Sequence, residues 1–132
     1  DIGKIGISDS ILKKPSSLNA EETEIMHRHP LIGEGIVNPL KSFRHILDPI
    51  KHHHEFLDGS GYPDGLRADK IPLVTRVLTV ADIFDALVTE RPYRKAFNID
   101  EAKNEFEVML GRGKIDKDVV HALFSLIEEK KI

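Results

Sequence analysis

Helix-capping and helix-breaking residues recur along the chain and restrict it to a series of short helices. Asn19 stands three positions before Glu22, and Asn98 stands three positions before Glu101. This spacing is the capping box, in which the two side chains satisfy backbone donors at the start of a helix. The chain offers no convincing pair of strands, so we expect an all-α fold. Helices are predicted over residues 19–37 with a disturbance at Pro30, over 48–58, over 73–90, over 98–111, and from Asp116 to Lys130 and Lys131.

The composition fits one globular domain and argues against several classes of protein. The chain has 132 residues, 40% hydrophobic and 31% charged, which is enough apolar material for a core. No apolar run approaches the ~20 residues that span a bilayer, and a net charge of −3 without a basic block argues against DNA binding. The absence of cysteine excludes disulfides and thiolate metal sites, and it suits a cytoplasmic location.

The carboxylate of Asp82 lies in the most apolar stretch of the chain. The residues around it are hydrophobic on nearly every side, so the helix over 73–90 is expected to be buried on most faces. An ionised carboxylate in such a helix is costly unless it is paired or bound to a metal. Two interpretations stay open: a structural role, as a pair with Arg76 or a helix cap, and a role as metal ligand.

Histidine is over-represented, with 7 residues, of which His52, His53 and His54 are consecutive. Adjacent helical residues are separated by roughly 100°, so the rings cannot all point one way, although two could line one cavity. A solvated histidine patch is the alternative. His29 adds an imidazole at a helix end. Imidazole and carboxylate without thiolate suit iron, manganese or zinc.

Six motifs, taken in order, resemble those of the HD-GYP family, and the resemblance covers essentially the whole chain. The motifs are Asp1-Ile2-Gly3-Lys4-Ile5-Gly6-Ile7, Met26-His27-Arg28-His29-Pro30, His53-His54-Glu55 followed by Asp58-Gly59-Ser60-Gly61-Tyr62-Pro63, Ile71-Pro72 with Arg76, Ala81-Asp82-Ile83-Phe84-Asp85-Ala86-Leu87, and Arg91-Pro92-Tyr93-Arg94.

The resemblance implies an HD-domain-like helical bundle that acts as a metal-dependent phosphodiesterase in bacterial second-messenger signalling. Its substrate would be cyclic di-GMP, cut to the linear dinucleotide, with GMP as the product of a further cleavage. It implies two or three divalent metal ions, iron first and manganese or zinc as alternatives. The implied metal ligands are Asp1, His29, His53, His54 and Asp82; Asp1 and Lys4 are implied in catalysis, and Tyr62, Arg91 and Arg94 in substrate binding.

Two departures from the family pattern affect this expectation. The family has a histidine directly before the first aspartate, whereas this sequence starts at Asp1. We therefore expect residues 1–132 to be an HD-GYP domain without its amino-terminal helices, and the loss of that ligand would weaken metal binding. His52 makes a triplet where the family has a pair, and the register of Glu55 and the following loop selects His53 and His54 as that pair.

Two other functions stay open. The domain could be a catalytically silent module that binds cyclic dinucleotides or another protein, because a ligand is missing and the Gly-Tyr-Pro loop offers a docking surface. It could also be a hydrolase for a different nucleotide. The resemblance further implies an upstream regulatory or sensor domain, as in a response regulator, and a diguanylate cyclase domain as a partner for the Gly-Tyr-Pro loop.

Overall fold

The computed structural model describes residues 1–91 and 94–129, and these residues form helices without a β-strand. The expected all-α fold is confirmed. Pro92, Tyr93, Lys130 and Lys131, which belong to predicted features, lie outside the described residues. No helix in the described part is long and apolar enough to cross a membrane. The described α-helices are α1 (Asp9–Leu12), α2 (Ala20–Met26), α3 (His29–Val37), α4 (Leu47–His52), α5 (Leu73–Val88), α6 (Ile99–Gly111) and α7 (Lys117–Glu128), and the described 3-10 helices are η1 (Ile2–Gly6), η2 (Lys41–Ile46) and η3 (Ala68–Lys70).

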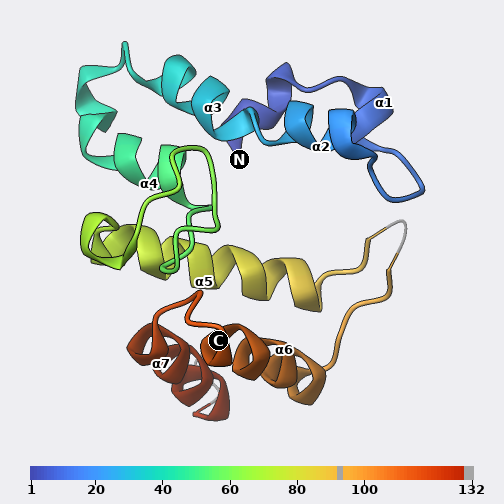
Figure 1. Cartoon of the computed structure of the whole chain (residues 1–132), viewed down its shortest axis with the longest axis vertical. Coiled ribbons are helices and arrows are strands. Elements are labelled where there is room, and N and C mark those ends of the chain that lie inside the picture. Colours follow the sequence, from blue (N-terminus) through green and yellow to red (C-terminus); the bar gives the residue numbers. More distant parts are fainter. Residues whose placement is uncertain (92–93, 130–132) are drawn as a thin grey trace.

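The helices are arranged in tiers on the two sides of α5, as Figure 1 shows. η1, α1, α2 and α3 lie on one side, and α6 and α7 lie on the other. α4 and the loop that follows it stand at one end, between α3 and α5. This arrangement places α3, which begins at His29, across from α5.

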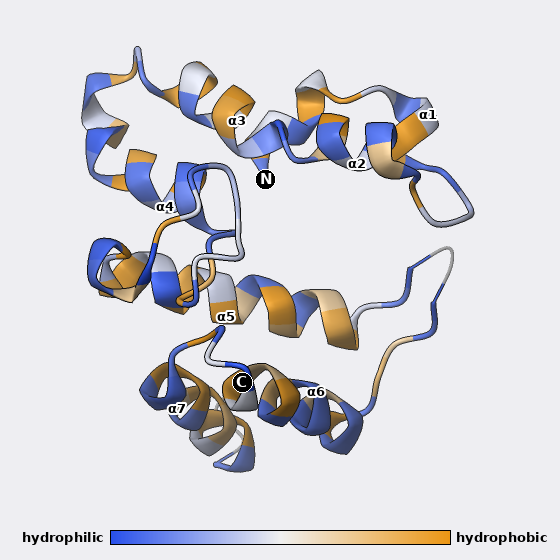
Figure 2. Ribbon diagram, viewed as in Figure 1, coloured by the Kyte–Doolittle hydropathy of each residue, from blue (hydrophilic) through white to orange (hydrophobic). Residues whose placement is uncertain are grey.

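The hydrophobic core lies between α5, α6 and α7, along which hydrophobic residues recur (Figure 2). The rings of Phe106 and Phe124 meet edge to face, with centroids 5.5 Å apart. Local caps fix the ends of these helices: the Asn98–Glu101 capping box is formed, and the Asp116 carboxylate accepts backbone N–H groups at the start of α7. Both predicted helix starts are therefore confirmed.

The expectation that α5 is buried on most faces is wrong. Leu73 is 64% exposed and Val77 is 47% exposed. These two residues, with Leu126 of α7, line an apolar groove of about 380 Å³. The reason is that α6 and α7 cover only part of α5, so that hydrophobic side chains beside the core remain at the surface.

The predicted helix over 19–37 consists of two helices. The Asn19–Glu22 capping box is formed and starts α2, which ends at Met26. α3 begins at His29, with Pro30 in its first turn. Proline is tolerated there because the first turn of a helix needs no backbone N–H from it. The break puts His29 at the start of α3, where its Nδ1 lies 2.7 Å from the carbonyl oxygen of Met26, the last residue of α2.

The prediction for α4 is wrong at both ends. Asp48 is not the N-cap but lies within the first turn, and its carboxylate accepts a hydrogen bond from Thr75 Oγ1 at 2.7 Å. The helix ends at His52 rather than near residue 58. Here the backbone N–H of Glu55 donates to the His52 carbonyl, an i to i−3 bond that closes a turn. His53 and His54 consequently lie just beyond the helix.

A close approach of backbones fixes η1 against α3. A Cβ atom on Gly3 would lie 1.8 Å from the carbonyl oxygen of His29 and 2.5 Å from the backbone nitrogen of Gly33. Only glycine permits this contact. The contact sets Asp1 beside His29.

Candidate metal centre

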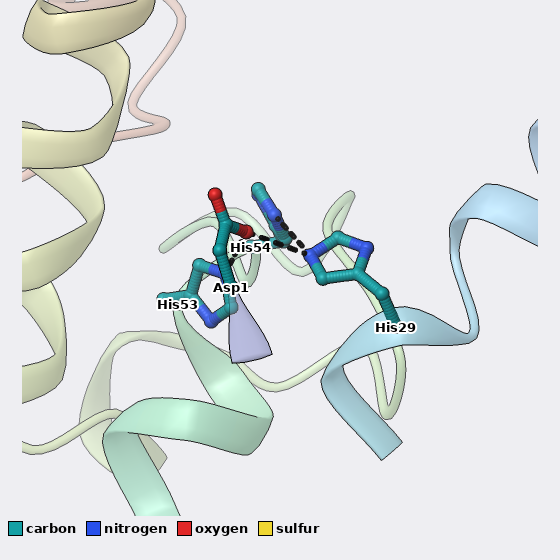
Figure 3. Close-up of side chains that lie close together, drawn as sticks. All are labelled: Asp1, His29, His53 and His54. Atoms are coloured by element: carbon teal, nitrogen blue, oxygen red, sulfur yellow. Dashed lines mark hydrogen bonds and ion pairs between the residues drawn. The ribbon is translucent and has the colours of Figure 1, made fainter. Parts of the chain in front are cut away.

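Four side chains from separate elements converge near the amino terminus. Asp1 precedes η1, His29 begins α3, and His53 and His54 follow α4. One ligand atom from each, a carboxylate oxygen or a ring nitrogen, lies within 4.8 Å of the others. Figure 3 shows the Asp1 carboxylate and the His54 ring both turned toward the His29 ring.

The distances within this cluster are those of atoms that share one centre. His29 Nε2 lies 3.3 Å from Asp1 Oδ1 and 3.1 Å from His54 Nε2. His53 Nε2 lies 3.7 Å from the same Asp1 oxygen. Two imidazole nitrogens and a carboxylate oxygen that face one another offer their lone pairs to a common cation.

The far nitrogens of two rings are held by the backbone. His29 Nδ1 lies 2.7 Å from the Met26 carbonyl oxygen, and His53 Nδ1 lies 2.8 Å from that of Ile50. A carbonyl only accepts, so each Nδ1 carries the proton and each Nε2 keeps its lone pair toward the cluster. Metal-binding histidines are oriented by such bonds. His53 Nε2 is buried without a hydrogen-bond partner among the described residues, as expected of a nitrogen placed for a metal.

Burial keeps these rings in the neutral form that binds metals. It lowers the pKa of His29 to about 4 and that of His54 to about 2, and it also lowers the pKa of His53. At neutral pH no proton has to leave the rings before a metal binds. The donor set and its protonation therefore fit a divalent transition metal.

Asp82 reaches the edge of this cluster from α5. Its Oδ2 lies 3.9 Å from His54 Nδ1. The alternative pair with Arg76 is wrong, because Arg76 donates instead to the Ile71 carbonyl at 2.7 Å and to Asp116 at 3.1 Å. Asp82 is partly exposed and faces the side of His54 opposite His29, where it could hold a further ion.

Comparison with known proteins agrees with this geometry. A family model described as HD domain matches residues 1–119. The chain belongs to the HD domain family. The expected resemblance to HD-GYP proteins is confirmed as well, both by curated relatives and by a solved structure of this fold. The HD domain spans less than a third of the length of the first two relatives below.

The relatives are bacterial phosphodiesterases. The HD domain is 48% identical over 102 residues, 77% of this chain and 22% of the relative, to 3′3′-cGAMP-specific phosphodiesterase 3 of Vibrio cholerae. It is 45% identical over 114 residues, 85% of this chain and 30% of the relative, to the cyclic di-GMP phosphodiesterase response regulator RpfG of Xanthomonas campestris. Bd1817, an HDG"Y"P protein from Bdellovibrio bacteriovorus, shares the fold, with a TM-score of 0.72 at 22% identity over 97% of this chain and 40% of that one.

A cleft of about 730 Å³ opens beside the cluster of Asp1, His29, His53 and His54 in the HD domain. Its volume falls in the range typical of small-molecule sites. Its walls contain both charged and apolar residues, which suits a ligand with both phosphates and rings. The lining residues include the sequence-predicted Lys4, His29, His54, Tyr62, Asp82, Arg91 and Arg94, together with Leu12, Leu18, Met26, Ile83, Ala86, Leu87, Phe97 and Glu105.

The predicted residues at the cleft differ in what they contact. Lys4 Nζ lies 2.7 Å from Asp1 Oδ2, so its positive charge stands next to the cluster. Tyr62 is stacked on His54, with ring centroids 4.9 Å apart, and on His27, at 3.7 Å. Burial raises the pKa of the Tyr62 phenol. The Gly-Tyr-Pro loop thus packs on the cluster, and the Tyr62 ring forms part of the cleft wall.

The two predicted arginines, Arg91 and Arg94, share a backbone contact, and the side chain of Arg94 makes further contacts of its own. Arg91 and Arg94 exchange backbone hydrogen bonds with each other. The Arg94 guanidinium donates to the carbonyls of Ala86 and Leu87 at the end of α5, and it lies 4.3 Å from the ring centre of Phe97. Part of the Arg94 side chain is therefore committed to capping α5, and a joint grip of both arginines on one phosphate stays a prediction.

Sequence reasoning missed the role of Glu55. Its buried carboxylate accepts the backbone N–H groups of Asp64 at 2.6 Å, Gly65 at 3.0 Å and Leu66 at 3.0 Å. These bonds fold the Gly-Tyr-Pro loop back onto the histidine segment. An acidic residue placed between two histidines and a glycine-rich loop was the available signal.

Proposed function

We propose that this HD domain is a metal-dependent phosphodiesterase that hydrolyses a cyclic dinucleotide, with cyclic di-GMP as substrate and the linear dinucleotide as product. The observation that carries the proposal is the convergence of four donor atoms within 4.8 Å at the edge of a large cleft. The names of the relatives, which are cyclic di-GMP and 3′3′-cGAMP phosphodiesterases, support it. GMP would follow from cleavage of the second phosphodiester.

The donors proposed to hold the metals are Asp1, His29, His53, His54 and Asp82. Nitrogen and oxygen donors without sulfur suit iron, and manganese or zinc as alternatives. When bound, such ions supply an activated water near neutral pH and polarise the phosphate. Asp1 Oδ1 faces both His29 Nε2 and His53 Nε2, so Asp1 would supply the carboxylate oxygen that accompanies these two nitrogens.

Hydrolysis joins a water oxygen to phosphorus and releases a sugar oxygen, which must gain a proton. The Lys4 ammonium, held beside the cluster by Asp1, would offset the charge that grows on the phosphate and can deliver that proton. Arg91, which lines the cleft, offers a planar fork for phosphate oxygens. Tyr62 supplies a ring face against which a base can stack.

Metal content and product analysis together test the proposal. Anaerobically purified protein should carry at least one transition-metal ion per chain and convert cyclic di-GMP to the linear dinucleotide. His54→Ala and Asp82→Ala should lose metal and activity together, while Lys4→Ala should lose activity but keep the metal. Substoichiometric metal that is unaffected by His54→Ala would overturn the proposal. Tight binding of intact cyclic di-GMP by the metal-loaded protein would point to the silent binding module instead.

The same proposal includes which cyclic dinucleotide is cut, where in the cell the domain acts and which other domains it works with. We place the domain in the cytoplasm, joined to an upstream regulatory or sensor domain, with a diguanylate cyclase domain as partner of the Gly-Tyr-Pro loop. The relative RpfG, named a response regulator, supports the upstream domain. Relative rates on cyclic di-GMP and 3′3′-cGAMP, measured with the full-length protein, decide the substrate.

A further inference from the structure

The first histidine of the triplet, His52, lies outside the cluster of Asp1, His29, His53 and His54 but is not a solvated side chain. Its side chain is only 12% exposed. Its Nδ1 lies 2.9 Å from Asp48 Oδ1, and its Nε2 lies 3.0 Å from Asp64 Oδ2. The ring therefore bridges a residue of α4 and a residue of the Gly-Tyr-Pro loop.

Further polar contacts extend this bridge in both directions. Asp48 Oδ2 accepts the hydroxyl of Thr75, a fully buried residue of α5, at 2.7 Å. Asp64 Oδ2 also receives Lys51 Nζ at 2.7 Å. We refer to Thr75, Asp48, His52, Asp64 and Lys51 as the polar clamp. It runs from α5 through α4 to the loop, and so it joins the elements that surround the histidine cluster.

The polar clamp is not a second metal site. The two carboxylates contact opposite edges of the imidazole, one at Nδ1 and one at Nε2. Donors on opposite sides of a ring cannot converge on one ion. The contacts serve to connect segments of the chain.

The segment that the clamp holds carries Tyr62. Asp64 lies two residues after Tyr62, whose ring is stacked on His54. The Glu55 carboxylate binds the loop backbone at residues 64–66, so it fixes the path of the chain after the tyrosine. The side chain of Asp64 adds the connection to α4 and α5 that Glu55 does not provide.

We propose that His52 is a positioning residue: through Asp64 it holds the Gly-Tyr-Pro loop so that Tyr62 stays stacked on His54. The stacked ring restricts the orientation of the His54 imidazole, whose Nε2 faces His29 and whose Nδ1 faces Asp82. The consequence for metal binding and hydrolysis rests on the proposed function, whereas the packing of Tyr62 does not.

Two substitutions at one position separate the two edges of the ring. The amide of glutamine reaches the place of imidazole Nε2, whereas the amide of asparagine reaches that of Nδ1. His52→Gln should keep the contact with Asp64 and hold the loop. His52→Asn should keep only the contact with Asp48, within α4, and loosen the loop, which then depends on Lys51 and Glu55.

Tyrosine fluorescence reports the loop without reference to activity. The chain has no tryptophan and two tyrosines, so Tyr93→Phe leaves Tyr62 as the sole reporter. In this background and without metal, His52→Asn should raise the acrylamide quenching constant of Tyr62, and His52→Gln should not. In the otherwise native chain, His52→Asn should weaken metal affinity by about 10-fold, as for other residues behind metal ligands, with rescue by His52→Gln.

Control variants keep the result interpretable. Lys13→Ala breaks an exposed pair with Asp9, neither of which belongs to the polar clamp, and should change neither measurement. Asp64→Asn weakens the clamp from the loop side and should match His52→Asn, which covers the case in which one variant fails to fold. Unchanged Tyr62 quenching in both variants would refute the positioning role. Altered quenching in a protein that never binds metal would leave the positioning role standing and refute the proposed function.

Discussion

The buried carboxylate of Glu55 is hydrogen-bonded by backbone N–H groups rather than by another side chain among the contacts of the described residues. It accepts N–H groups of three successive residues, Asp64, Gly65 and Leu66. An ionised carboxylate can only accept hydrogen bonds, and the three backbone groups that face it can only donate them. The stability of the loop therefore depends on the Glu55 carboxylate, which accepts all three hydrogen bonds.

Glu55→Gln should destabilise the protein more than its small change in size suggests. One carboxylate oxygen becomes an NH₂ group that faces a backbone donor, so a buried hydrogen bond is lost and two donors oppose each other. We expect a loss of about 2–3 kcal/mol in the free energy of unfolding, measured with urea. Glu107→Gln on the exposed face of α6 is the matched control, with an effect within about 0.5 kcal/mol. Equal effects of the two variants would contradict this account of Glu55.

At the level of elements, the contact between η1 and α3 determines where the first metal-ligand candidates lie. Gly3 approaches the backbone of α3 so closely that no side-chain atom fits. Asp1 and His29 are the residues that flank this contact. Their separation is thus set by two backbones, not by flexible side chains.

A pair of glycine-to-alanine substitutions tests this contact. Gly3→Ala forces η1 away from α3, and we expect a loss of about 1–3 kcal/mol in stability together with weaker metal binding. Gly35→Ala lies on α3, where a new Cβ meets nothing within 4 Å. There the gain in helix propensity should raise stability by about 0.5–1 kcal/mol. Calorimetric melting measures the stability of both variants, and titration with metal measures the affinity. A Gly3→Ala variant with unchanged stability and unchanged metal affinity would contradict the role of the contact.

Elements were predictable from sequence where their signals are local. The capping boxes at Asn19 and Asn98 act over three residues, and both are formed. The start of α4 was not predictable, because Asp48 bonds Thr75, which lies 27 residues away, and this contact uses the carboxylate that a cap would need. Exposure of α5 was equally hidden, since it depends on which faces α6 and α7 leave uncovered.

For the whole molecule, the buried neutral histidines link folding to pH. His29 and His53 titrate freely in the unfolded chain, with a pKa near 6.5. In the folded, metal-free protein burial lowers both values, that of His29 to about 4. The unfolded chain therefore binds more protons below pH 6.5, and stability must fall as the pH falls toward 4.

The metal-free protein should be most stable at or above neutral pH. Between pH 6.5 and about 4, the His29 imidazole should lower the free energy of unfolding by about 1.4 kcal/mol per pH unit, and His53 should add to the loss in the same direction. Urea unfolding of chelator-treated protein at pH 7, 6 and 5 measures the slope, and His29→Gln should reduce it. Stability that is flat or rises on acidification would show that these rings are not held neutral.

The candidate site itself was predictable only through motif order. Asp1, His29 and His54 are far apart in the sequence, and no periodicity brings them together. The resemblance placed them, and the geometry now shows their donor atoms within 4.8 Å. Glu55 and the polar clamp escaped notice because their partners are backbone groups or residues on other elements.

The two walls of the cleft come from different parts of the amino-acid sequence. The clustered donors all lie within residues 1–54, whereas the opposite wall includes Ile83, Leu87, Phe97 and Glu105. Substitutions in the second stretch can reshape the space for a ligand without touching those four donors. Under the proposed function, changes in that second stretch would alter which base the cleft accepts while the four donors stay the same, so that related domains could differ in substrate preference.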